Sequence, residues 1–143
     1  MTAISHATAR LCNAPASRAL AHLSTAAGFS RWNLGLSNCR EVAPGLFTGM
    51  SLFDGSTGWV RVALWPDLEA VDYHVGPSPE HLVPRIHSRV ISGESFGYAE
   101  GTCLVSLLAW RPADMSEERW QRLVRTHETE MDLIQAQLGT QAR

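Results

Sequence analysis

A chain of 143 residues is long enough for one domain with one hydrophobic core, and its formal net charge of −2 argues against the strongly basic surface that nucleic acid requires. All twelve basic residues are arginine, so reactions that need a lysine nucleophile are excluded. No apolar run approaches the roughly 18 residues of a membrane span, and residues 1–9 lack the basic and apolar regions of a signal peptide, so a cytoplasmic location without a membrane span is expected.

The N-terminal part of the chain predicts a strand followed by one short helix. Residues 4–11 alternate small and polar side chains in the manner of a strand. Residues 13–15, Asn-Ala-Pro, are typical of a helix start, with the asparagine as the cap and the proline in the first turn. Gly28 is expected to end this helix, and residues 29–32 to form a turn that places two aromatic side chains under a sheet.

Between residues 46 and 110 the side chains alternate with a period of two, which is typical of antiparallel strands. Five strands are expected here, at residues 46–53, 59–65, 71–75, 85–91 and 102–110. The first two flank Asp54-Gly55, a strong hairpin signal because glycine supplies the positive φ of a tight turn. Together with residues 4–11 this makes about six strands, while residues 34–45, which are broken by Gly and Pro, are assigned to none.

Residues 114–139 predict one long amphipathic helix. Its apolar stripe follows three-, four- and seven-residue steps and consists of Trp120, Leu123, Val124, His127, Met131, Ile134 and Leu138. The charged residues assigned mostly to the opposite, solvated side are Arg119, Arg122, Arg125, Glu128, Glu130 and Asp132. Asp114 is expected to cap the first turn, with Glu117 three residues later. A helix that closes a run of strands lays its stripe across the sheet and leaves a cavity where the two do not meet.

Both ends of the chain resemble one superfamily. The residues that carry the resemblance are Asn13-Ala14-Pro15, Ala19-Leu20, Leu23, Phe29-Ser30-Arg31-Trp32 and the strand at residues 101–110 that leads into the long helix. They resemble the START-related helix-grip superfamily (SRPBCC), which includes START lipid-transfer domains, the birch-pollen allergen family and polyketide aromatase/cyclase-type proteins. The resemblance implies a single α+β domain over residues 1–143 with the helix-grip fold. In this fold a curved antiparallel sheet of about six strands wraps around the long C-terminal helix, with short helices near the N-terminus.

The resemblance implies a pocket rather than one activity, because members of the superfamily bind lipids, hormones or polyketides and some are enzymes. We expect a small, largely apolar ligand, lipid-, aromatic- or polyketide-like, to lie between the sheet and the C-terminal helix. The residues expected to bind it are Tyr73, His87, Trp120, Leu123, Val124, His127 and Met131. Two alternatives stay open: a cyclase- or hydratase-type enzyme that uses a cavity histidine as acid and base, and an interaction module without a ligand.

The three cysteines, Cys12, Cys39 and Cys103, lie far apart and lack the spacing of zinc ligands or of a CxxC pair. They are expected to be reduced and partly buried. Neither a metal ion nor a cofactor is expected.

His127 is the one polar residue on the apolar stripe of the long helix. It either projects into the cavity, where an imidazole could orient a ligand carbonyl or move a proton near neutral pH, or it is a structural histidine bonded to the backbone. Both readings stay open from the sequence.

The hairpin of residues 71–75 and 85–91 carries a second polar cluster. If its loop is symmetric about residues 80–81, His74 faces His87 and Asp72 faces Arg89, all on one side of the sheet. This side is expected to meet solvent, because an antiparallel sheet normally keeps one polar face. A change of register by one residue would reverse the assignment.

The first hairpin carries aromatic residues that share a parity along the chain: Phe47, Phe53, Trp59 and Trp65. Both faces of this hairpin are apolar, so one is expected to fill the core and the other to meet a second surface. An aromatic face outside the core predicts a possible homodimer or partner site.

Overall fold

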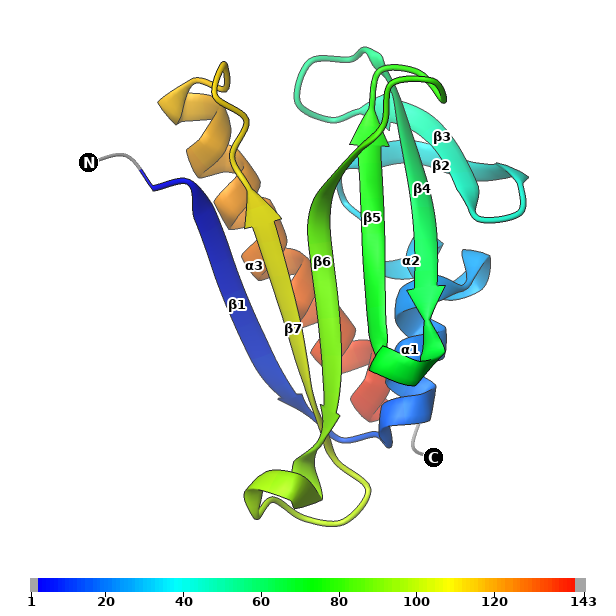
Figure 1. Cartoon of the computed structure of the whole chain (residues 1–143), viewed down its shortest axis with the longest axis vertical. Helices are drawn as coiled ribbons and strands as arrows, with labels where there is room; N and C mark the ends of the chain where they lie inside the picture. The colour runs from blue at the N-terminus through cyan, green and yellow to red at the C-terminus, as the bar shows by residue number, and fades with distance from the viewer. Residues whose placement is uncertain (1–2, 141–143) are drawn as a thin grey trace.

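Seven strands and three α-helices make up residues 3–140, the part of the chain that this computed structural model describes (Figure 1). In chain order the strands are β1 (Ser5–Cys12), β2 (Leu36–Ala43), β3 (Leu46–Ser51), β4 (Thr57–Trp65), β5 (Ala70–Gly76), β6 (Val83–Ser92) and β7 (Cys103–Trp110). The helices are α1 (Ala16–Ser24), α2 (Ala26–Trp32) and α3 (Glu117–Thr140). Two 3-10 turns, η1 (Pro66–Leu68) and η2 (Gly93–Phe96), follow β4 and β6.

The strands form one antiparallel sheet in the order β1-β7-β6-β5-β4-β3-β2, and the helices lie on one face of it (Figure 1). Pairing of the first strand with the last places β1 beside α3. Arg10 of β1 donates hydrogen bonds to Glu128 at 2.8 Å and to Asp132 at 3.1 Å, both on α3. The architecture confirms the expected α+β helix-grip fold, with a curved sheet, a long C-terminal helix and short N-terminal helices.

The core lies between the inner face of the sheet and the helices. The sheet contributes Phe47, Val71, Tyr73, Val90, Val105 and Leu107, all nearly or fully buried. Opposite them lie Leu23, Phe29 and Trp32 of the short helices and the C-terminal half of α3, with Met131, Ile134 and Leu138. The second half of α3 therefore belongs to the main core, and the first half of the helix lies outside it.

The expected single N-terminal helix is two helices, because the chain breaks at Thr25. Thr25 has an extended backbone, and its hydroxyl accepts a hydrogen bond from the amide of Gly28 at 3.1 Å, which caps α2. Gly28 is therefore inside a helix and does not end one. A Cβ at Gly28 would lie 2.1 Å from the carbonyl oxygen of His22, so only glycine lets the helices approach this closely. Pro15, which cannot cap through its side chain, takes the N-cap position expected for the asparagine.

One strand, β2, is present where the sequence assigned none. It pairs with β3 at the edge of the sheet, and its register shifts twice. Asn38 has a left-handed backbone with a φ of 51°, which interrupts the alternation of side chains. The strand is also mostly exposed, so it carries no period-two apolar pattern that a sequence reading could detect.

The register of the β5–β6 hairpin differs from the expected one. Asp72 pairs with His87, and Ala70 pairs with Arg89, because the loop is centred nearer residue 79 than residues 80–81 and a bulge interrupts the ladder after Tyr73. The four polar residues still share the outer side of the sheet, opposite buried Val71, Tyr73, Ser88 and Val90. On this outer side Arg89 is exposed, while Asp72, His74 and His87 are only partly exposed, so the polar side meets solvent in part.

The β3–β4 hairpin divides the aromatic set that the sequence grouped on one face. Phe47 pairs with Val60 and lies fully buried in the core, whereas Trp65 is half exposed on the outer face of β4. The turn joins residues of opposite parity, so odd positions on β3 share a face with even positions on β4. The expected four-residue aromatic face is wrong.

Helix α3 begins after Ser116, whose hydroxyl accepts a hydrogen bond from the amide of Arg119 at 3.1 Å. Ser116 thus takes the capping role expected for Asp114. Within residues 3–140, no helix is both long and apolar enough to cross a membrane.

Candidate functional site

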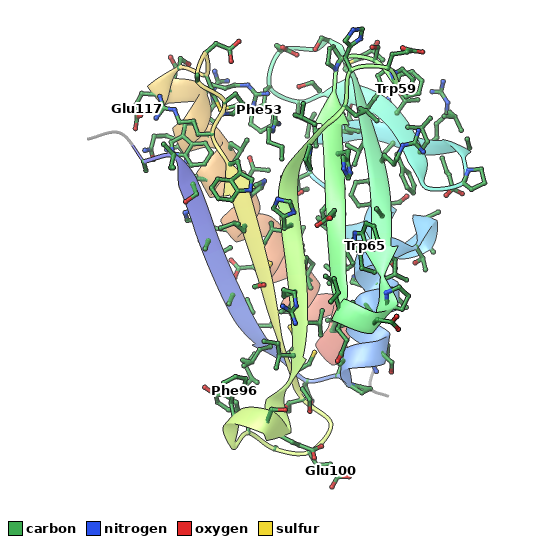
Figure 2. The ribbon with its side chains drawn as sticks, viewed as in Figure 1. Phe53, Trp59, Trp65, Phe96, Glu100 and Glu117 are labelled. Carbon is green, nitrogen blue, oxygen red and sulfur yellow. The ribbon has the colours of Figure 1, made fainter. Side chains whose placement is uncertain are left out.

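A cavity of about 260 Å³ lies between the first half of α3, helix α2 and the β3 to β7 part of the sheet. Its apolar wall includes Phe29, Trp32, Leu36, Val60, Leu107 and Leu123. Phe53, beside the start of α3, and Trp59, near the start of β4, lie toward the same end of the molecule in Figure 2 and also line the cavity. The cavity lies beside the first half of α3, which packs on β7 through Trp120 and Leu123, while the second half of the helix belongs to the main core.

Three of the residues predicted to bind a ligand line this cavity: Tyr73, Leu123 and His127. Their role in binding stays a prediction. The hydroxyl of Tyr73 donates a hydrogen bond to the carbonyl of Leu23 at 2.7 Å. This bond ties β5 to the end of α1, so the Tyr73 proton is already engaged within the protein.

The other four predicted residues lie away from the cavity. Trp120 and Val124 pack with Ala109 of β7 in a separate cluster, and Met131 belongs to the main core. His87 lies on the outer face of the sheet, where its Nδ1 is 2.8 Å from Asp72. The cavity meets one edge of the helical stripe, at Leu123 and His127, whereas Trp120 and Val124 lie toward the other edge. For His87 the reason is strand parity, which puts it opposite Ile86 and Ser88.

His127 and Glu130 form a buried polar pair at the cavity wall. Their side chains are 6% and 7% exposed, and His127 Nε2 lies 4.0 Å from Glu130 Oε1. Burial, followed by the charges of His6 and Arg85, lowers the pKa of His127 to about 4. Burial raises the pKa of Glu130 to about 8, although its carboxyl accepts a hydrogen bond from the amide of Leu34 at 2.9 Å. At pH 7 the histidine is therefore neutral and the carboxyl mostly protonated, so the two do not form an ion pair.

Two arginines complete the polar lining. Arg119 of α3 stacks on Phe53, with its guanidinium carbon 3.7 Å from the ring centroid. Arg85 of β6 lies at the bulge, and burial and then repulsion from Arg119 lower its pKa. Within residues 3–140, Nε of Arg85, Nη1 of Arg119 and Nδ1 of His127 are buried without a hydrogen-bond partner.

Sequence reasoning missed Arg85, Arg119 and Glu130. Glu130 was assigned to the solvated side of the helix, but it is three residues after His127 and four before Ile134, which is the spacing of the buried stripe. This spacing predicts a buried position for Glu130, whereas the charge of its side chain predicts an exposed one. For Arg85 the signal is Pro84, because a proline within an interior strand marks a bulge.

The outer face of the sheet carries a second cluster, formed by Trp65, Asp72, His87 and Trp110. The indole of Trp65 donates to Asp72 at 3.0 Å, and the rings of His87 and Trp110 meet edge to face at 6.5 Å. Trp65 is 50% exposed and Trp110 41% exposed. The imidazoles on this face lie outside the cavity and cannot serve a reaction within it.

Among the residues that the structure describes, no three His, Cys, Asp or Glu side chains come together in a group that could hold a metal ion. Cys12 and Cys103 are fully buried and pair across β1 and β7, and burial raises the pKa of both thiols, to about 12 and about 11. Such thiols are poor nucleophiles at neutral pH.

Neither a family model nor a curated protein matches this sequence. Solved structures do match. A START superfamily protein from Mycobacterium smegmatis is 11% identical, with 95% of this chain and 97% of that chain covered and a TM-score of 0.68. The Zhui aromatase/cyclase from Streptomyces sp. R1128 is 12% identical, with 97% and 95% covered and a TM-score of 0.64. The Aha1 dimer from Colwellia psychrerythraea is 13% identical, with 96% and 97% covered and a TM-score of 0.68.

At these identities the similarity concerns the fold. The chain has the helix-grip fold that the START superfamily protein and the aromatase/cyclase also have, and the resemblance read from both ends of the sequence is confirmed at that level. A homodimer of this chain stays a prediction, for which Trp65 and Trp110 now offer the exposed aromatic surface. The mass of the protein in solution, measured by light scattering, would test it.

Proposed function

We propose that the protein binds a small, largely apolar ligand in the cavity between the sheet and α3. The observation that carries this proposal is the cavity of about 260 Å³ walled by aromatic and aliphatic side chains. Ligand pockets typically measure roughly 300–1,000 Å³, so this one suits a molecule with one or two rings or a short acyl chain. A lipid with two acyl chains is too large. The fold shared with a START superfamily protein and an aromatase/cyclase supports this class of ligand.

The binding free energy would come from contact with apolar walls such as Phe29, Trp32 and Leu107, at about 25 cal/mol for each Å² of apolar surface removed from water. A few polar groups would orient the ligand. His127, neutral at pH 7, would use its unpartnered Nδ1 to hydrogen-bond a ligand hydroxyl or carbonyl, depending on the tautomer.

A matched pair of variants on α3 tests the location of this site. Thr126 lines the cavity, whereas Thr129 is exposed, and each hydroxyl donates to the carbonyl four residues earlier, at 2.8 and 3.0 Å. An indole at position 126 fills part of the cavity, so Thr126→Trp is expected to weaken binding of the neutral dye N-phenylnaphthylamine about ten-fold or more. Thr129→Trp should leave it unchanged. Fluorescence titration measures both.

The far-ultraviolet circular dichroism of the two variants provides the folding control. Wild-type protein that leaves the dye unbound at millimolar concentration would contradict the proposed function. Equal dye affinity in the two folded variants would place the binding site elsewhere.

A second candidate function rests on the neutral His127–Glu130 pair. A neutral imidazole can accept a proton while a protonated carboxyl donates one, which is the arrangement that enolisation of a ketone requires. His127 would take a proton from the carbon next to the carbonyl, and Glu130 would protonate the carbonyl oxygen. The same transfers occur in cyclase- and hydratase-type reactions, the class foreseen as an alternative.

Deuterium exchange at the α-carbon of tetralone, followed by NMR at pH 7, tests this second candidate. Wild-type protein should accelerate exchange, and His127→Phe or Glu130→Gln should slow it by about a hundred-fold, the usual contribution of one acid or base. The rate should fall below the pKa of His127, about 4, and above that of Glu130, about 8. Exchange no faster than in imidazole buffer would leave binding as the function.

A further inference from the structure

Two cationic groups line the cavity without a carboxylate partner. Arg85 reaches it from β6 and Arg119 from α3, and neither takes part in an ion pair or a side-chain hydrogen bond among residues 3–140. Each has a buried nitrogen with no acceptor. Arg10 and Arg111, by contrast, each hold a carboxylate at 2.8 Å or less.

The remaining charged or titratable groups of the cavity offset these cations only in part. Asp54, which also lines it, is exposed, and its carboxylate accepts hydrogen bonds from the amide and the hydroxyl of Ser56 at 3.0 and 2.6 Å. Glu130 is mostly protonated at pH 7, and His127 is neutral. The lining therefore presents two cations against one exposed carboxylate, which attracts Arg119 but is already hydrogen-bonded to Ser56.

The backbone directs both guanidinium groups into the cavity. The bulge leaves Arg85 without a partner on β5, between Pro84, which pairs with His74, and Ile86, which pairs with Tyr73. Arg85 and its neighbour Ile86 both line the cavity, which strict alternation along the strand would forbid. The ring of Phe53 holds the guanidinium of Arg119 in place by stacking.

A partly buried cation whose buried nitrogen has no acceptor costs the folded protein stability, and two such cations in one cavity repel each other. Arginine is the side chain suited to a carboxylate, because its planar N–H groups form paired hydrogen bonds to both oxygens. We propose that the ligand is an organic acid, with its apolar body against Phe29, Trp32 and Leu107 and its carboxylate held by Arg85 and Arg119. This inference rests on the proposed binding function and adds the chemical class of the ligand.

Competition against the neutral dye N-phenylnaphthylamine tests the inference with two probes of one shape, naphthoate and naphthamide. In wild-type protein at pH 7, naphthoate should displace the dye at a concentration at least ten-fold lower than naphthamide. Arg85→Met and Arg119→Met keep an apolar side chain of similar length, and each should abolish this preference. Arg89→Met on the outer face of the same strand is the matched control and should retain it.

The outcomes separate the two proposals. No dye binding to wild-type protein contradicts the binding function itself. Dye binding with equal displacement by the two probes, or with none, overturns the organic acid and leaves the apolar site. A preference lost in Arg89→Met as much as in Arg85→Met also overturns it, because the anion would then bind the outer surface. Thermal unfolding without ligand guards against misfolding, and Arg85→Met should keep or raise the midpoint, since it removes an unpaired charge.

Discussion

Replacing Glu130 with glutamine is expected to stabilise the protein at pH 8 by up to roughly 5 kcal/mol and to change its stability little at pH 4.5. Glutamine reproduces the protonated carboxyl that the folded state prefers, and its side-chain oxygen can still accept the hydrogen bond from Leu34. In the wild-type chain, folding at pH 8 must either bury a charge or take up a proton at Glu130.

The sign follows from the raised pKa of Glu130, about 8 in the folded protein against an ordinary value of 4.5. Between these values the folded state binds more protons than the unfolded chain, so stability is fully present below pH 4.5 and is lost as the pH rises through 8. His127 acts in the opposite direction. Its folded pKa of about 4 against 6.5 makes stability fall as the pH falls from 6.5 to 4.

Between pH 4.5 and 6.5 the effects of the two groups on the free energy of unfolding nearly cancel. In this range the folded state carries a proton on Glu130, and the unfolded chain carries one on His127. In Glu130→Gln the free energy of unfolding should therefore fall as the pH falls below 6.5, because of His127. It should no longer fall as the pH rises from 6.5 to 8. Urea unfolding at several pH values measures both. Parallel curves for the variant and the wild type would mean that Glu130 ionises normally in the folded protein.

Replacing Gly28 with alanine is expected to destabilise the protein by about 3 kcal/mol or more. The added methyl group would lie 2.1 Å from the carbonyl oxygen of His22 and 2.7 Å from two other backbone atoms of that residue. Backbone atoms cannot yield without separating α1 from α2. The same carbonyl accepts a hydrogen bond from the indole of Trp32 at 3.0 Å, so separation would also move a wall of the cavity.

The matched control is Gly139→Ala in the last turns of α3, where the described part of the chain places nothing within 4 Å of an added Cβ. Alanine favours a helix over glycine by about 1 kcal/mol at most, so this variant should be as stable as the wild type or slightly more. Denaturant unfolding compares the two. A Gly28→Ala protein as stable as the Gly139→Ala protein would show that the helices tolerate a wider separation.

The sequence by itself determined the fold class and most of the elements. The apolar stripe of seven residues from Trp120 to Leu138 and the two-residue alternation of residues 46–110 both arise because one face of a single helix or strand is buried. Apolar residues therefore recur with the period of that helix or strand. The same reasoning placed Leu123 and His127 on the buried side of α3. The strand at residues 36–43 was not predicted, because an exposed edge strand with a left-handed Asn38 shows no periodic apolar face.

Only the tertiary structure decided which buried residues meet a cavity and which meet the core. Leu123 and Met131 both belong to the apolar stripe, yet Leu123 lines the cavity and Met131 lies in the main core. Cross-strand register depends on loop and bulge geometry, so Asp72 meets His87 and Arg85 turns inward without any signal in the alternation. The charge of Glu130 likewise depends on its surroundings, because burial from several elements at once raises its pKa.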